Sequence, residues 1–92
     1  MNRIERKLFK LSDEIATLRE AERLAVEELG YHRHLHDDAS RDAAVSDSPI
    51  DREDARVTGG DVARMERHVA ALRRTIDTFE RRRERLLSKL RD

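Results

Sequence analysis

Apolar side chains recur in two stretches of this sequence at alternating steps of four and three residues. The first stretch is interrupted at Glu22 and otherwise consists of Ile4, Leu8, Leu11, Ile15, Leu18, Ala25, Leu29, His32, His36, Ala39 and Ala43. The second is interrupted at Arg83 and otherwise consists of Val62, Met65, Val69, Leu72, Ile76, Phe79, Leu86 and Leu90. This spacing puts one buried stripe along each of two α-helices, as in a coiled coil. The fold class predicted is all-α, with two long helices.

The two stripes match each other when the helices run in opposite directions. If the numbers of facing residues sum to 94, almost every member of one stripe meets a member of the other. Ile15 then faces Phe79, and His36 faces Thr58. The same register centres the turn on residue 47, so the chain is expected to form an antiparallel coiled-coil hairpin.

The segment Ser46-Asp47-Ser48-Pro49 has the residues of a turn followed by a helix start. Ser48 can cap exposed amides, and Pro49 suits the first helical position because its missing N–H would be unpaired there. We expect one helix over about 3–45, a tip at 46–49 and a second helix over about 50–91. Together they would form a single domain over residues 1–92.

The weak point of the second helix is Thr58-Gly59-Gly60-Asp61. Each glycine costs about 1 kcal/mol in a helix interior, and Thr58 with Asp61 three residues later resembles a helix start. A kink or break at 58–61 is therefore compatible with the sequence. The alternative to the full hairpin is a loop over 37–60 that joins two shorter helices.

Composition narrows the functional classes. Charged residues make up 43% of the chain and aromatic residues 3%, a composition typical of long charged helices. The net charge of zero removes the overall basic field of non-specific nucleic-acid binders, so direct nucleic-acid binding is not expected. The sequence has no nucleophile beside a base and no phosphate-binding glycine loop, so we expect neither an enzyme nor a cofactor.

The sequence contains no segment that we expect to enter or cross a membrane. The N-terminus lacks the apolar stretch of a signal peptide, and no run approaches the ~20 apolar residues needed to cross a bilayer. With no cysteine, the chain also has no disulfide framework. We expect a cytoplasmic protein.

Four sets of residues are candidate sites. An acidic cluster crowds the turn: Asp47, Asp51, Glu53 and Asp54. A basic patch lies in the C-terminal arm: Arg73, Arg74, Arg81, Arg82 and Arg85. Apolar residues outside the two stripes form a candidate partner or dimer surface: Phe9, Leu24, Val26, Tyr31, Leu35 and Leu87.

The fourth set is a histidine cluster, in which His32 and His36 are four residues apart and so lie on one face of a helix. That spacing occurs in zinc sites, but no third ligand is evident and we predict no metal. A pH-sensitive contact between the helices and ordinary polar seam positions are the alternatives.

The stretch Asp47-Ser48-Pro49-Ile50-Asp51-Arg52-Glu53-Asp54-Ala55, at the turn of a long hairpin, resembles the tip of the DksA/TraR family. The architecture is more loosely similar to the hairpin of the Gre transcript-cleavage factors. The resemblance implies insertion into the secondary channel of bacterial RNA polymerase, with Asp51 as the principal tip acid, Asp47 before it and Arg52 after it. The chain has no cysteines for the zinc-binding head of the first family and no counterpart of the globular domain of the second.

The leading hypothesis is a protein-binding hairpin that regulates transcription through RNA polymerase. One alternative is a homodimeric coiled-coil scaffold or adaptor, whose charge polarity directs assembly. Another is weak nucleic-acid binding through the Arg-rich C-terminal arm.

Overall fold

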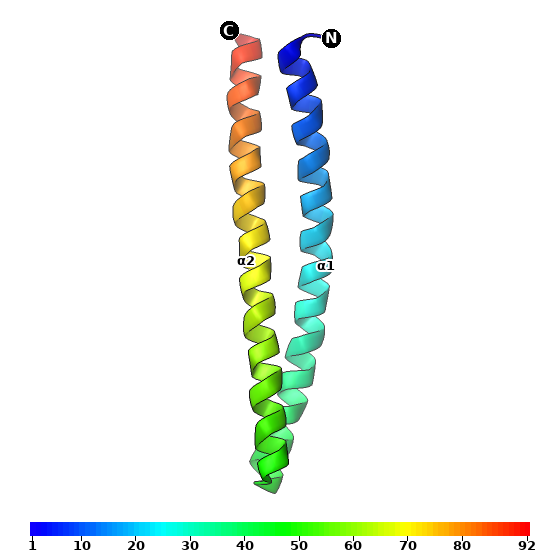
Figure 1. Ribbon diagram of the computed structural model, residues 1–92, viewed down its shortest axis with the longest axis vertical. Helices are drawn as coiled ribbons and strands as arrows, with labels where there is room; N and C mark the ends of the chain where they lie inside the picture. Colours follow the sequence, from blue (N-terminus) through cyan, green and yellow to red (C-terminus); the bar gives the residue numbers. More distant parts are fainter. The chain divides into compact units, whose positions relative to one another are not determined.

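The computed structural model describes all residues 1–92, and nearly all of them are helical. Helix α1 spans Arg3–Ser46 and helix α2 spans Pro49–Arg91, with the turn at Asp47-Ser48 between them (Figure 1). There are no strands. The predicted all-α helical hairpin is thus confirmed, and both helix boundaries lie within one residue of those expected.

Helix α1 begins with a capping bond that the sequence reasoning did not identify. The Oδ1 of Asn2 accepts a hydrogen bond from the backbone amide of Glu5 at 2.8 Å, and the carbonyl of Asn2 accepts from the amide of Arg6. Asparagine at this position satisfies amides that have no partner inside the helix. Helix α2 ends with Lys89 and Arg91 in its last turn, where cations interact favourably with the helix dipole.

Helix α2 continues through the glycine pair. No helix boundary falls at 58–61, and the loop over 37–60 is excluded because α1 and α2 cover that range except for the turn. Thr58 does not start a new helix: its hydroxyl donates to the carbonyl of Asp54 at 2.9 Å, one turn earlier. The same hydroxyl is hydrogen-bonded to His36 Nδ1 of α1 at 3.0 Å.

Gly59 allows the close approach of His36. A Cβ atom at position 59 would lie 3.1 Å from the Cε1 of His36, closer than ordinary van der Waals contact. At Gly30 a Cβ would meet nothing within 4 Å, and at Gly60 it would meet only the end of the Arg64 side chain at 3.7 Å. A larger residue would therefore meet a close contact at Gly59 but not at Gly30 or Gly60.

We expect Gly30→Ala and Gly60→Ala each to raise the free energy of unfolding by about 0.5–1 kcal/mol, because alanine is the better helix former. Gly59→Ala should gain less than either, because the His36 ring must shift. Denaturation followed by circular dichroism measures all three. Equal gains at the three positions would show that the contact with His36 does not restrict position 59.

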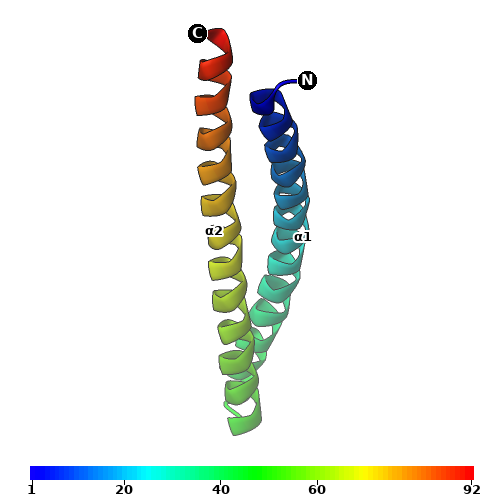
Figure 2. The same ribbon diagram turned by 45° about the horizontal axis from the view of Figure 1, so that its top comes forward.

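The contacts divide the chain into two compact units. Unit 1 consists of Met1–Arg23 and Ala70–Asp92, and unit 2 consists of Leu24–Val69. Each unit holds one part of α1 and one part of α2, running in opposite directions, and unit 2 contains the turn (Figure 2). The core of unit 1 contains Leu11, Ile15 and Ile76, and that of unit 2 contains Ala25, Leu29 and Val69. All six come from the predicted stripes, whereas the single domain over 1–92 stays a prediction.

Contacts between the helices within each unit follow the predicted register. In unit 2, His36 and Thr58 are hydrogen-bonded as facing residues. On the flank of the stripes, Arg19 pairs with Glu80 in unit 1 and Arg33 with Glu66 in unit 2. Their numbers sum to 99 in both cases, so one register applies to both units.

No helix of the structure has the length and apolar content needed to cross a membrane.

Candidate functional site

The turn is closed by side chains of its own segment. Asp47 follows the last residue of α1 and has a positive φ of 51°, a left-handed conformation that aspartate tolerates better than most residues. The hydroxyl of Ser46 donates to the Asp51 carboxylate and accepts from the amide of Ser48 at 3.3 Å. Ser48 begins α2 through its carbonyl, which accepts from the amide of Arg52. The side-chain contact is thus made by Ser46, whereas the sequence had indicated Ser48.

Two carboxylates of the predicted acidic cluster are already paired with arginines. Arg52 Nη1 lies 2.7 Å from Asp47 Oδ1 and also donates to the carbonyl of Asp47 at 2.8 Å. Arg56 donates to both carboxylate oxygens of Glu53, at 2.9 and 2.5 Å. Asp51 and Asp54 have no cation partner. Asp51 and Asp54 are therefore available to pair with a cation of a partner, whereas Asp47 and Glu53 are already paired.

An open groove in unit 2 collects further carboxylates. It has a volume of about 310 Å³ and is lined by Leu35, Asp38, Ala39 and Asp42 of α1 and by Asp51, Asp54, Val57 and Thr58 of α2. We call it the acidic groove. Its volume lies at the lower end of the range for small-molecule sites, ~300–1,000 Å³, so it fits one or two side chains of a partner.

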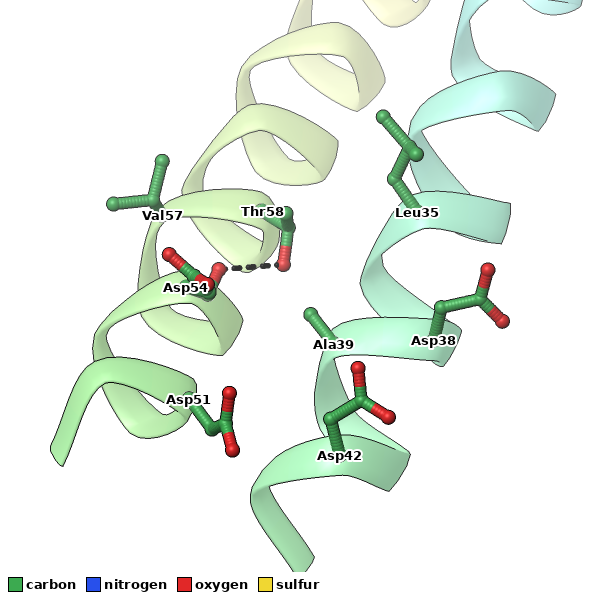
Figure 3. A pocket seen from close by; sticks show the side chains of 8 residues that line it. All are labelled: Leu35, Asp38, Ala39, Asp42, Asp51, Asp54, Val57 and Thr58. Atoms are coloured by element: carbon green, nitrogen blue, oxygen red, sulfur yellow. Dashed lines mark hydrogen bonds between the residues drawn. The ribbon is translucent and has the colours of Figure 1, made fainter. Parts of the chain in front are cut away.

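Figure 3 shows how the carboxylates of the acidic groove are directed. Asp51 extends from α2 toward α1, Asp42 extends along α1 toward the turn that carries Asp38 and Ala39, and Asp38 points away from α2. Arg41 Nη2 and His34 Nε2 each lie 3.5 Å from Asp38. The side chain of Asp42, like that of Asp54, makes no hydrogen bond or ion pair within the chain.

The sequence reasoning missed Asp38 and Asp42 as site residues. They follow the histidine cluster in sequence and were not assigned to the tip. The register that places Ala43 opposite Asp51 also places Asp42 beside this pair, so the signal was present. The predicted acidic cluster was limited to Asp47, Asp51, Glu53 and Asp54, which crowd the turn itself.

The ion pair of Glu53 with Arg56 lowers the pKa of the Glu53 carboxyl from its ordinary value, chiefly through the hydrogen bond and in part through charge attraction. A lowered pKa stabilises the folded state at a pH above the ordinary value, and this contribution is lost as the pH falls through the lowered value. We expect Arg56→Gln to raise the titration midpoint of Glu53, measured by NMR of its side-chain carboxyl. An unchanged midpoint would mean that the pair does not persist in solution.

The six apolar residues predicted to lie outside the core are all exposed: Phe9, Leu24, Val26, Tyr31, Leu35 and Leu87. Their use as a partner or dimer surface stays a prediction. Three exposed residues of unit 2 were not predicted: Val45 and Ile50 on either side of the turn, exposed by 88% and 73%, and Val57 in the acidic groove. Apolar side chains thus accompany the carboxylates at the tip.

The histidines serve different contacts. His36 is half-buried and bonded to Thr58, while the rings of His32 and Tyr31 meet edge to face at a centroid distance of 5.9 Å. His34 is exposed. No three His, Cys, Asp or Glu side chains are grouped so that they could hold a metal ion.

The arginines of the basic patch all belong to unit 1 and have different partners. Arg73 Nε donates to Glu22 of α1 at 2.7 Å, Arg81 pairs with Asp77, and the guanidinium of Arg82 lies 5.1 Å from the centroid of the Phe79 ring. Arg74 and Arg85 have no partner within the chain. Glu22, the acid that interrupts the first stripe, thus uses its charge in a contact between the helices.

No family model, curated protein or solved structure matches the chain. The arrangement of the side chains therefore supplies the structural argument about function.

Proposed function

We propose that the chain is a non-enzymatic protein-binding hairpin that acts through its acidic tip, and that its partner is bacterial RNA polymerase, whose transcription it modulates. The observation that carries the proposal is that Asp42, Asp51 and Asp54 line the acidic groove without a cation partner. Like charges held close together raise the free energy of the folded chain. A basic surface on a partner would remove that repulsion. The packing of the two helices does not itself require aspartates at these positions.

The apolar residues of the tip support the same function. Val45 and Ile50 flank the turn, and Val57 lies in the groove itself, all largely in contact with solvent. An exposed apolar group contributes to affinity when a partner buries it, at roughly 25 cal/mol per Å² of apolar area. A partner site with cationic side chains around an apolar pocket would match this combination.

The nature of the partner rests on the resemblance of residues 47–55 to the DksA/TraR tip. The resemblance implies that Asp51 is the principal acid, and Asp51 is the residue that Ser46 holds in place from the other side of the turn. Inside a channel, little water screens a carboxylate, so its charge acts more strongly on a metal site or basic pocket there. Binding to the polymerase would place the protein in the cytoplasm.

The test compares three proteins for binding to purified bacterial RNA polymerase and for their effect on transcription in vitro. The tip variant carries Asp47→Asn, Asp51→Asn, Glu53→Gln and Asp54→Asn. The control variant carries Asp13→Asn, Glu14→Gln, Glu28→Gln and Asp37→Asn, which remove four carboxylates that have no ion pair and lie outside the tip.

We expect the wild type and the control variant to bind and to change transcription, and the tip variant to bind at least about tenfold more weakly. Absence of binding by the wild type would reject the polymerase as the partner. Equal binding by all three proteins would reject the tip as the contact.

A further inference from the structure

The ion pairs inside unit 2 leave negative charge unpaired. The unit holds eleven acidic and six basic side chains, a formal charge of −5. Five of its six arginines already pair with carboxylates of the same unit: Arg33, Arg41, Arg52, Arg56 and Arg64. Little cationic charge therefore remains within the unit for the carboxylates of the acidic groove.

Unit 1 has the opposite imbalance. It holds fourteen basic and nine acidic side chains, a formal charge of +5. Lys7, Lys10 and Arg82 form no ion pair within the chain, and all three line one groove between the helices of this unit. The groove has a volume of about 380 Å³, and Leu11, Glu14 and Leu86 complete its lining. We call it the basic groove.

The two grooves are complementary. Their volumes are similar, about 310 and 380 Å³, and each has leucine among its lining residues. One presents four aspartates and the other presents two lysines and an arginine beside one glutamate. Lysine and arginine side chains are long enough to lie along apolar surface while their charges reach a carboxylate.

Helix stability does not explain where these charges lie. Lys7 and Lys10 are close to the start of α1, and Asp42 lies just before its last turn, which contains no basic residue. The helix dipole favours negative charge near the first of these ends and positive charge near the second. Lys7, Lys10 and Asp42 lie outside the first and last turns of α1, where the dipole acts, so the dipole does not explain their positions.

We propose that the basic groove of one copy of the chain binds the acidic groove of a second copy. A second copy supplies two lysines and an arginine for the aspartates of the acidic groove, on a helical surface of similar size. Self-association also suits a two-helix chain, because a small core leaves much apolar surface that oligomerisation can bury. This interaction uses the acidic groove, to which Asp51 and Asp54 of the tip also contribute, and it is tested through Asp38 and Asp42, which the tip variant leaves unchanged.

The test measures mass by sedimentation equilibrium at about 20 and about 500 mM salt, between which the Debye length falls from ~20 to ~4 Å. We expect the wild type to reach at least twice its monomer mass of 10.8 kDa at the lower salt and to dissociate at the higher. A chain that stays monomeric at both salt concentrations overturns the proposal, and the occupant of the acidic groove is then a different protein.

Two charge reversals identify the surfaces. We expect Lys7→Glu with Lys10→Glu, and separately Asp38→Lys with Asp42→Lys, each to weaken self-association at least about tenfold, because like charges then face each other. An equimolar mixture of the two variants should associate again, because each reversed groove meets an oppositely charged groove on the other variant. Failure of the mixture to associate, or self-association that neither reversal changes, overturns the proposal.

Matched controls separate the grooves from overall charge. Arg6→Glu with Arg74→Glu and, separately, Asp37→Lys reverse exposed charges that form no ion pair and lie outside both grooves, and they should leave self-association within about twofold of the wild type. Circular dichroism checks that each variant keeps its helical content. If a reversal loses helix, the neutral pairs Lys7→Gln with Lys10→Gln and Asp38→Asn with Asp42→Asn replace it, with the same direction of effect expected.

Discussion

Replacing Ile15 by alanine should lower the free energy of unfolding by about 2–4 kcal/mol. Ile15 is the most deeply buried residue of the core, with 2% of its surface exposed. Only two other residues of unit 1 are buried in the core, Leu11 on α1 and Ile76 on α2. Small domains have a total stability of roughly 5–15 kcal/mol, so this single change removes a large part of it.

The matched control for Ile15→Ala is Ile50→Ala, the same chemical change at a residue that is 73% exposed beside the turn. It should change the free energy of unfolding by less than about 0.5 kcal/mol. Urea denaturation followed by circular dichroism measures both variants. Similar losses for the two would show that the helices do not pack through the predicted stripe in unit 1.

Replacing Leu29 by alanine should cost about 2–4 kcal/mol in the same experiment. Leu29 lies in the core of unit 2 and is 6% exposed, so the lost side chain leaves a cavity between the helices. Leu24 lies five residues earlier in the same helix and the same unit but is 47% exposed. Its replacement by alanine should cost less than about 1 kcal/mol, since most of its surface is already in water.

The pair Leu29→Ala and Leu24→Ala is informative because residue type, helix and unit are the same in both. The only large difference is burial, so the difference between their free energies of unfolding measures the packing of unit 2. A cost for Leu24→Ala as large as that for Leu29→Ala would mean that Leu24 is covered in solution. In that case a partner surface or a second copy must cover it, and light scattering on the same sample would distinguish a second copy from a monomer.

The tip variant and the groove reversal change different carboxylates, although Asp51 and Asp54 belong both to the tip and to the acidic groove. Neutralising Asp47, Asp51, Glu53 and Asp54 addresses binding to RNA polymerase. Reversing Asp38 and Asp42 addresses binding to a second copy. Loss of one activity with retention of the other would assign the surfaces individually, and loss of both in each variant would show that one surface serves both partners.

The two helices and their register could be predicted because each depends on signals that are local or periodic. A heptad stripe requires a helix with one buried side, and Pro49 after two serines and an aspartate requires a turn. The hydrogen bond between His36 and Thr58 joins two residues that the register had placed opposite each other. The glycine pair was harder to interpret, because the propensity cost of glycine is local while the His36 ring that packs on Gly59 comes from the other helix.

The sequence by itself determined the all-α fold, the position of the turn and the two stripes that contain the six core residues, since periodicity and turn chemistry depend on neighbours along the chain. Only the tertiary structure decided which charges remain unpaired. Arg52 and Arg56 pair with Asp47 and Glu53, whereas Asp42 of α1 lines one groove with Asp51 and Asp54 of α2, and no arginine is among its lining residues. Whether an ion pair forms depends on the side-chain rotamers and on the distance between the two helices. Neither can be read from the amino-acid sequence. The candidate site therefore became visible only when both helices were placed side by side.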